Sequence, residues 1–178
     1  MSIPVTGVDP TTMRGALLAE LAREAPVTRR VLERVPEERL AWKPHPKSMS
    51  LGALALHVAT IPGGVAEFVS EPTREVPSFL APEATSKPQI LEALEDSIMR
   101  ARAHLQAWTE AHLRAEWRMT REGATLFALP RIDMVRSLMF NHWYHHRGEL
   151  LVYLRLLDVP VPAVYGPTAD ENPFLTRA

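Results

Sequence analysis

Residues 141–150 read NHWYHHRGEL and place two histidines, His142 and His146, one helical turn apart. Two neutral imidazoles on one face of a helix can bind one divalent ion from a rigid support. At about 100° per residue, both histidines fall inside the apolar stripe of a helix predicted over residues 132–157, where Leu or Ile would pack better. We interpret the pair as a metal-binding element. The residues that define this stripe are Val135, Met139, Leu150, Tyr153 and Leu157.

A third histidine, His57, lies at the edge of the apolar stripe of another predicted helix. A lone histidine there is more often a packing residue, but the core of a helical bundle brings ligands from facing helices together. The chain has no cysteine, so a transition metal must be bound by nitrogen and oxygen. We therefore predict that His57, His142 and His146 bind a divalent ion such as Zn, Ni, Fe or Cu. Three ligands leave the open position that is typical of catalytic sites.

The other four histidines have weaker patterns. His145 is rotated about 100° from His146 and falls outside the stripe, so we expect it at the surface or beside a ligand. His45 lies in a proline-rich loop and could line the mouth of a pocket. His104 and His112 fall off, or at the end of, the stripe of a third predicted helix, and we expect them to be solvated.

The paired histidines do not form the H-E-x-x-H motif of zinc proteases, because Trp143 occupies the position of its glutamate. The motif therefore supplies no general base. Glu149, three residues after His146, is a candidate base or hydrogen-bond partner of a ligand, and an ordinary surface carboxylate is the alternative. Arg147 could orient an anionic substrate or pair with a surface acid, and we favour the acid. The sequence defines no catalytic residue beyond these two candidates.

The composition fits one globular domain over residues 1–178, with 46% hydrophobic and 23% charged residues. A formal net charge of -1 gives no sign of a broad basic surface for nucleic acid. No apolar run approaches the roughly 18 to 20 residues of a membrane span. Met1–Asp9 lacks the features of a signal peptide. We therefore expect a cytoplasmic protein that binds neither nucleic acid nor membrane.

Prolines and capping residues indicate where the first two helices begin and bend. Asp9-Pro10 predicts the start of the first helix, because Asp is a favoured N-cap and proline suits the first helical position. Pro26 is expected to kink or split this helix. Ser48 or Ser50 can cap the second helix, and Pro62-Gly63-Gly64 is expected to kink or break it.

The remaining segments complete a helical fold. A third helix follows the capping-box sequence of residues 86–89. The pattern changes at residues 116–129, where Arg121–Ala124 could turn between two short strands. The tail over about residues 159–178 is rich in proline and expected to be extended. Four long amphipathic segments predict an all-α fold, an antiparallel four-helix bundle with a small β-hairpin between the third and fourth helices.

Three stretches of the chain resemble the DinB-like (DinB/YfiT-like) superfamily of metalloenzymes: Trp42–Ser48 leading into Leu51-Gly52 and His57, residues 141–150, and the tail residues 161–171. The resemblance implies a four-helix bundle, often dimeric, in which three histidines bind a divalent metal. Carried over to this chain, the ligands are His57, His142 and His146. Many members have Gln where this chain has Glu149, a change that leaves the ligands intact but alters the charge near the site.

The resemblance implies less about the reaction, because one fold carries many activities. Relatives include transferases and isomerases that use low-molecular-weight thiols, and others are described as metal-dependent hydrolases. We expect a metal-dependent thiol transferase or hydrolase that acts on a small molecule and forms a homodimer. A low-molecular-weight thiol would be its second cofactor. The alternatives are a non-catalytic metal-stabilised binding or stress-response module, and a plain bundle with hydrogen-bonded core histidines.

Overall fold

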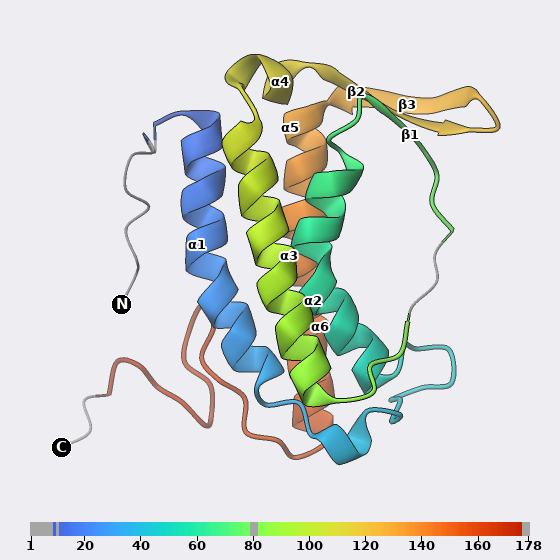
Figure 1. Cartoon of the computed structure of the whole chain (residues 1–178). Helices are drawn as coiled ribbons and strands as arrows, with labels where there is room; N and C mark the ends of the chain where they lie inside the picture. The colour runs from blue at the N-terminus through green and yellow to red at the C-terminus, as the bar shows by residue number, and fades with distance from the viewer. Residues whose placement is uncertain (1–8, 10, 79–81, 176–178) are drawn as a thin grey trace.

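A computed structural model describes residues 9, 11–78 and 82–175 of the chain. The long helical segments α1, α2, α3 and α5–η2–α6 lie side by side, and a small sheet extends from one end of them (Figure 1). The fold is therefore mostly helical with a small three-stranded sheet, which confirms the helical class but adds strands and short helices to the predicted bundle. The elements are α1 (Met13–Leu32), η1 (Glu37–Arg39), α2 (Leu51–Phe68), β1 (Thr73–Glu75), α3 (Lys87–Ala107), α4 (Glu110–Arg114), β2 (Glu116–Arg121), β3 (Ala124–Pro130), α5 (Arg131–Met134), the π-helical η2 (Val135–Asn141) and α6 (His142–Leu156).

Side-chain caps mark where α1, α2 and α3 begin. Ser50, one of the two caps predicted for α2, and Ser86, the cap predicted for α3, each accept a backbone N–H of the first turn through the hydroxyl. The prediction for α1 is wrong, because Thr12 rather than Asp9 is its N-cap. The Asp9 carboxylate instead accepts the backbone N–H of Thr11, before the helix. Pro10 and residues 1–8, on which the signal-peptide argument depends, lie outside the described residues.

The prolines inside helices do not end them. α1 continues through Pro26 and α2 through Pro62, so of the kink or break predicted at each proline the break does not occur. Pro62 has no N–H, which deprives the Val58 carbonyl of its usual partner one turn earlier. The buried indole N–H of Trp143 donates to that carbonyl at 2.9 Å. A side chain from α6 therefore supplies the hydrogen bond that the proline removes, and it ties α6 to α2.

Helix α2 is the central apolar helix of the fold. Its 18 residues have a mean hydropathy of 1.3, so by length and composition it could cross a membrane, contrary to the sequence prediction. However, 67% of it is buried inside the fold, as expected of a core helix. Its contact with α3 is close, because a β-carbon at Gly63 would lie 2.7 Å from the Ser97 carbonyl oxygen. Gly63 also donates its N–H to the buried Ser97 hydroxyl at 2.8 Å.

The predicted hairpin is confirmed. Strands β2 and β3 pair antiparallel, and Glu122 and Gly123 have φ values of 52° and 80° in the turn that joins them. The sequence did not predict the third strand, β1, which pairs parallel with β2 from Thr73 opposite Arg118. A three-residue strand between Pro72 and the following proline-rich stretch has no periodicity by which it could be recognised. The sheet lies beside the end of α2 (Figure 1).

The tail after α6 has no helix or strand up to residue 175, as predicted for an extended segment. Val161 and Ala163 are buried. Two carboxylates of the tail stabilise its conformation, because Asp170 accepts the N–H of Val161 and Glu171 accepts the N–H of Ala163, both at 2.9 Å. Glu171 also pairs with Arg30 of α1 at 2.5 Å, so the tail is attached to the first helix.

Candidate metal centre

The structure brings the three predicted ligands together. His57 comes from α2, and His142 and His146 come from the first two turns of α6. Their ring centroids are 4.6 to 5.1 Å apart, and the Nε2 atoms of His57 and His142 are separated by 3.4 Å. One nitrogen of each imidazole lies within 4.8 Å of the others, and all three residues are half-buried. This arrangement is chemically able to bind a metal ion.

Hydrogen bonds orient two of the imidazoles. The Nδ1 atom of His142 is 3.3 Å from the Leu138 carbonyl, and Nδ1 of His146 is 2.5 Å from a carboxylate oxygen of Glu149. Both contacts favour a proton on Nδ1, because a carbonyl and a carboxylate oxygen can only accept. The lone pair of each ring is then on Nε2. Histidines that bind metals usually donate their other ring N–H in this way.

The environment also keeps the imidazoles of His57 and His142 uncharged. Burial, followed by the neighbouring His146 and His142, lowers the pKa of His57 to about 4. Burial and then His146 lower the pKa of His142 as well. Both shifts favour the neutral ring, which is the form that binds a metal. At neutral pH, these two side chains therefore offer nitrogen lone pairs without first losing a proton.

A π-helical segment sets the direction of the paired histidines. The segment η2 directly precedes His142, and a π-helix has more residues per turn than an α-helix. A stripe extrapolated from Val135 at 100° per residue is therefore out of register after it. Tyr153 and Leu157, predicted in the core stripe, are half-buried, and the histidines lie beside the core rather than within it. The buried residues of α6 are Trp143, Arg147, Leu150 and Leu154.

The two candidate catalytic residues have different positions. Glu149 contacts the centre through His146, and its other oxygen is 3.3 Å from Nε2 of the exposed His145. Arg147 points into the core, where it pairs with Glu24 at 2.8 Å. The acid that Arg147 contacts is thus buried rather than on the surface, and the arginine is not directed at the histidines.

The remaining histidines do not join the cluster. His45 is exposed, and its Nδ1 accepts the N–H of Lys47 at 3.2 Å. The expectation that His104 and His112 are solvated is wrong, because both are half-buried. His104 contacts the Ser70 hydroxyl at 2.9 Å, and His112 stacks on Trp108 with a centroid distance of 5.4 Å. Their helix stripe could not reveal this, because the burial comes from neighbouring segments.

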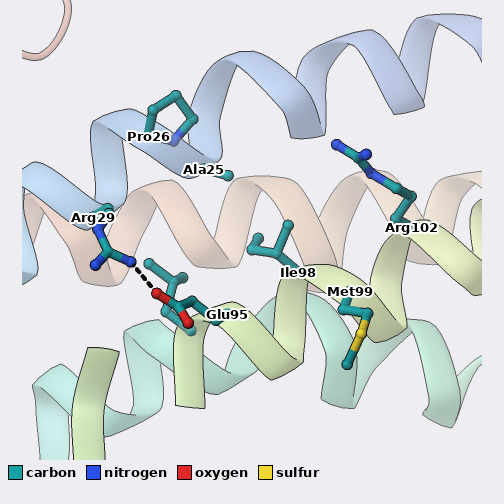
Figure 2. Close-up of a pocket in the computed structure, with 8 residues that line it drawn as sticks. Ala25, Pro26, Arg29, Glu95, Ile98, Met99 and Arg102 are labelled. Atoms are coloured by element: carbon teal, nitrogen blue, oxygen red, sulfur yellow. Dashed lines mark hydrogen bonds and ion pairs between the residues drawn. The ribbon is translucent and has the colours of Figure 1, made fainter. Parts of the chain in front are cut away.

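A hollow lies away from these histidines, between α1 and α3 (Figure 2). Its volume is about 370 Å³, and Pro26, Ile98 and Met99 form much of its apolar surface. At its edge, Arg29 pairs with Glu95 at 2.5 Å. None of its lining residues comes from α2 or α6, and none is a histidine. The hollow therefore offers no group that resembles a reactive centre.

Known proteins resemble this chain over most of its length. The family model described as DinB family matches residues 6–173. The uncharacterized protein YrdA of Bacillus subtilis (strain 168) is 28% identical over 152 residues, which cover 83% of this chain and 85% of YrdA. A crystal structure of a DinB-like protein from Bacillus cereus ATCC 10987 has a TM-score of 0.64 and 24% identity, over 84% of this chain and 95% of that one. The DinB-like protein YjoA of B. subtilis has a TM-score of 0.64 and 21% identity, over 84% and 96%. At these identities, the two structures show the fold alone.

Proposed function

The chain belongs to the DinB family, as its sequence resemblance predicted, and on that premise we propose that it is a metal-dependent enzyme whose divalent ion is held by His57, His142 and His146. The spacing of the nitrogens carries this proposal. Two nitrogens bound at about 2.0–2.1 Å to one tetrahedral ion are about 3.3–3.4 Å apart. The Nε2 atoms of His57 and His142 are 3.4 Å apart. Two neutral rings at this separation are suited to share a cation.

The ligand set favours a catalytic ion over a structural one. Among the described residues, no fourth side chain lies close to all of His57, His142 and His146. A second, more exposed group of His145, His146 and Glu149 shares only His146 with them. Structural zinc sites have four protein ligands, whereas catalytic sites keep one position for water or substrate. When bound at such a site, a divalent ion polarises an oxygen atom or lowers the pKa of a bound water or thiol.

The protein's own residues would orient the histidine ligands and accept a proton from a reactant. The Leu138 carbonyl and the Glu149 carboxylate fix the rings of His142 and His146. Glu149 is also partly exposed, so it can accept a proton from a reactant at the same edge of the centre. Arg147 has no such role in this proposal, because its guanidinium is committed to Glu24.

We propose thiol transfer as the reaction, with hydrolysis as the second type, on the family resemblance. The test uses protein that is depleted of metal and then reconstituted with zinc, nickel or ferrous ion, and metal content is measured by mass spectrometry. Bacillithiol, mycothiol and glutathione are each offered with electrophilic acceptors. The reconstituted protein should consume at least one thiol faster than the depleted protein. Equal rates with all three thiols would contradict the thiol branch and leave hydrolysis to be screened.

A metal-stabilised module without turnover is the second candidate, because the three ligands join α2 to α6. In that case, chelation would lower the melting temperature strongly, while no substrate would be converted by the loaded protein. A homodimer and a cytoplasmic location stay predictions from the family and the composition. Sedimentation equilibrium tests the dimer directly.

Glu149→Ala is expected to weaken metal binding about 10- to 100-fold, the usual cost of losing the hydrogen-bond partner of a ligating histidine. The reason is that Nδ1 of His146 loses the carboxylate that orients it at 2.5 Å. Competition titration with a chromophoric chelator measures the dissociation constant. Glu149→Gln is the matched control, because its amide oxygen still accepts from Nδ1, and it should retain most of the affinity. Equal losses in both variants would indicate that charge, not orientation, is what Glu149 supplies.

A further inference from the structure

An apolar cavity lies directly beside the candidate metal centre. Its volume is about 290 Å³, and His57 and His142 are among the residues that line it. The rest of its surface comes from apolar residues of α2, η2, β2 and the segment after β1, among them Phe68, Leu138 and Met119. Apart from the two imidazoles, no described residue that lines it is charged or carries a hydrogen-bonding side chain. In this cavity, two of the proposed metal ligands, His57 and His142, therefore lie next to an apolar surface.

The third histidine of the centre, His146, does not line this cavity and has polar neighbours. His146 contacts Glu149, which in turn contacts the exposed His145. A molecule bound at the centre would thus contact apolar side chains near His57 and His142. Near His146 it would contact the carboxylate of Glu149 and the exposed imidazole of His145. Placing a charged group in the cavity would be costly, because nothing there replaces the water it loses.

We propose that the substrate of this centre carries an uncharged hydrocarbon group that occupies the cavity, with its reacting atom at the histidines. This inference rests on the proposed function and names the class of substrate. A cavity of about 150 Å³ binds benzene, so 290 Å³ accommodates a substituted aromatic ring or a medium-length alkyl chain. The polar part of the substrate, or a polar thiol, then lies on the side of His146 and Glu149. The small sheet contributes to the proposed binding site, because Met119 of β2 lines the cavity.

Straight-chain alkyl hydroxamates from acetyl to octanoyl are suitable probes, because the hydroxamate group binds divalent ions and only the tail changes. Affinity for the zinc-loaded protein, measured by titration calorimetry, should rise about fourfold per added methylene until the cavity is full. A hydroxamate whose tail ends in a carboxylate should show no such gain. Zinc content is measured on the same samples.

Two glycines provide a matched pair of variants. Gly64 lines the cavity and Gly148 does not, and a β-carbon at either position would have open space within 4 Å. Gly64→Leu should place a side chain in the cavity and abolish the gain with tail length, while its zinc content stays that of the wild type. Gly148→Leu should behave as the wild type. Met119→Gln, which puts an amide in the wall, should reduce the gain per methylene and serves if Gly64→Leu does not fold.

Each outcome separates the two proposals. A gain with tail length in the wild type and Gly148→Leu that disappears in Gly64→Leu supports the inference. A flat series on zinc-loaded wild type, or an equal gain in Gly64→Leu, overturns it and leaves the proposed metal site standing. A wild type that takes up no zinc, nickel or ferrous ion overturns the proposed function and this inference together.

Discussion

The double substitution His142→Ala/His146→Ala is expected to reduce bound divalent metal from about one ion per chain to none. It removes two of three nitrogens, and the remaining His57 cannot hold the ion alone. The fold should survive, because both histidines are only half-buried and lie beside the core. The buried core residue between them is Trp143, which the double variant keeps. Mass spectrometry after reconstitution and dialysis measures the metal, and circular dichroism of both depleted proteins checks the helices.

His145→Ala is the matched control for this experiment. His145 directly precedes His146, but 63% of its side chain is exposed. It contacts a carboxylate oxygen of Glu149 and the His146 ring, and it is not one of the three proposed ligands. Its loss should leave about one metal ion per chain. Metal retained by the double variant would show that the ion binds elsewhere. A wild type that takes up none would identify the three histidines as packing residues.

The sequence predicted the ligands through an argument that the structure only partly supports. The periodicity placed His142 and His146 in a core stripe with Val135 and Met139. In the structure, Val135 and Met139 lie within the π-helical η2, and the buried residues of the following α6 are Trp143, Arg147, Leu150 and Leu154, of which only Leu150 was predicted. The histidines turn toward His57 in this arrangement. A sequence pattern assumes uniform helical geometry and cannot reveal a π-helix.

Contacts between distant segments account for what the sequence did not predict. Nothing near Arg147 indicates that it is buried, because its partner Glu24 lies 123 residues earlier. The parallel pairing of β1 with β2 and the continuity of α2 through Pro62 also depend on remote partners, the latter on Trp143. Local signals were more dependable, although the Asp9 cap was wrong. Ser86 and the turn at Gly123 act as predicted, and Ser50 is one of the two caps that were predicted for α2.

Breaking the buried ion pair between Glu24 and Arg147 is expected to lower the free energy of unfolding by about 3–5 kcal/mol. Arg147 is 1% exposed and Glu24 is 9% exposed. Glu24→Gln leaves the guanidinium without a counter-charge, because its other partners, Thr28 at 3.0 Å and Tyr165 at 2.5 Å, are neutral. An uncompensated buried charge is what makes the loss large. Urea denaturation followed by circular dichroism measures it.

Two further variants show whether burial is the cause. Replacing both partners, as Glu24→Leu/Arg147→Met, should cost clearly less than the sum of the single losses, because it leaves no unpaired charge. The exposed pair of Arg29 and Glu95 is the matched control, with side chains 41% and 63% exposed, and Glu95→Gln should cost about 1 kcal/mol or less. Similar small losses at both pairs would contradict the burial argument. A Glu24→Gln protein that remains folded should still bind its metal, because Glu24 contacts Arg147 and Tyr165 rather than the histidines.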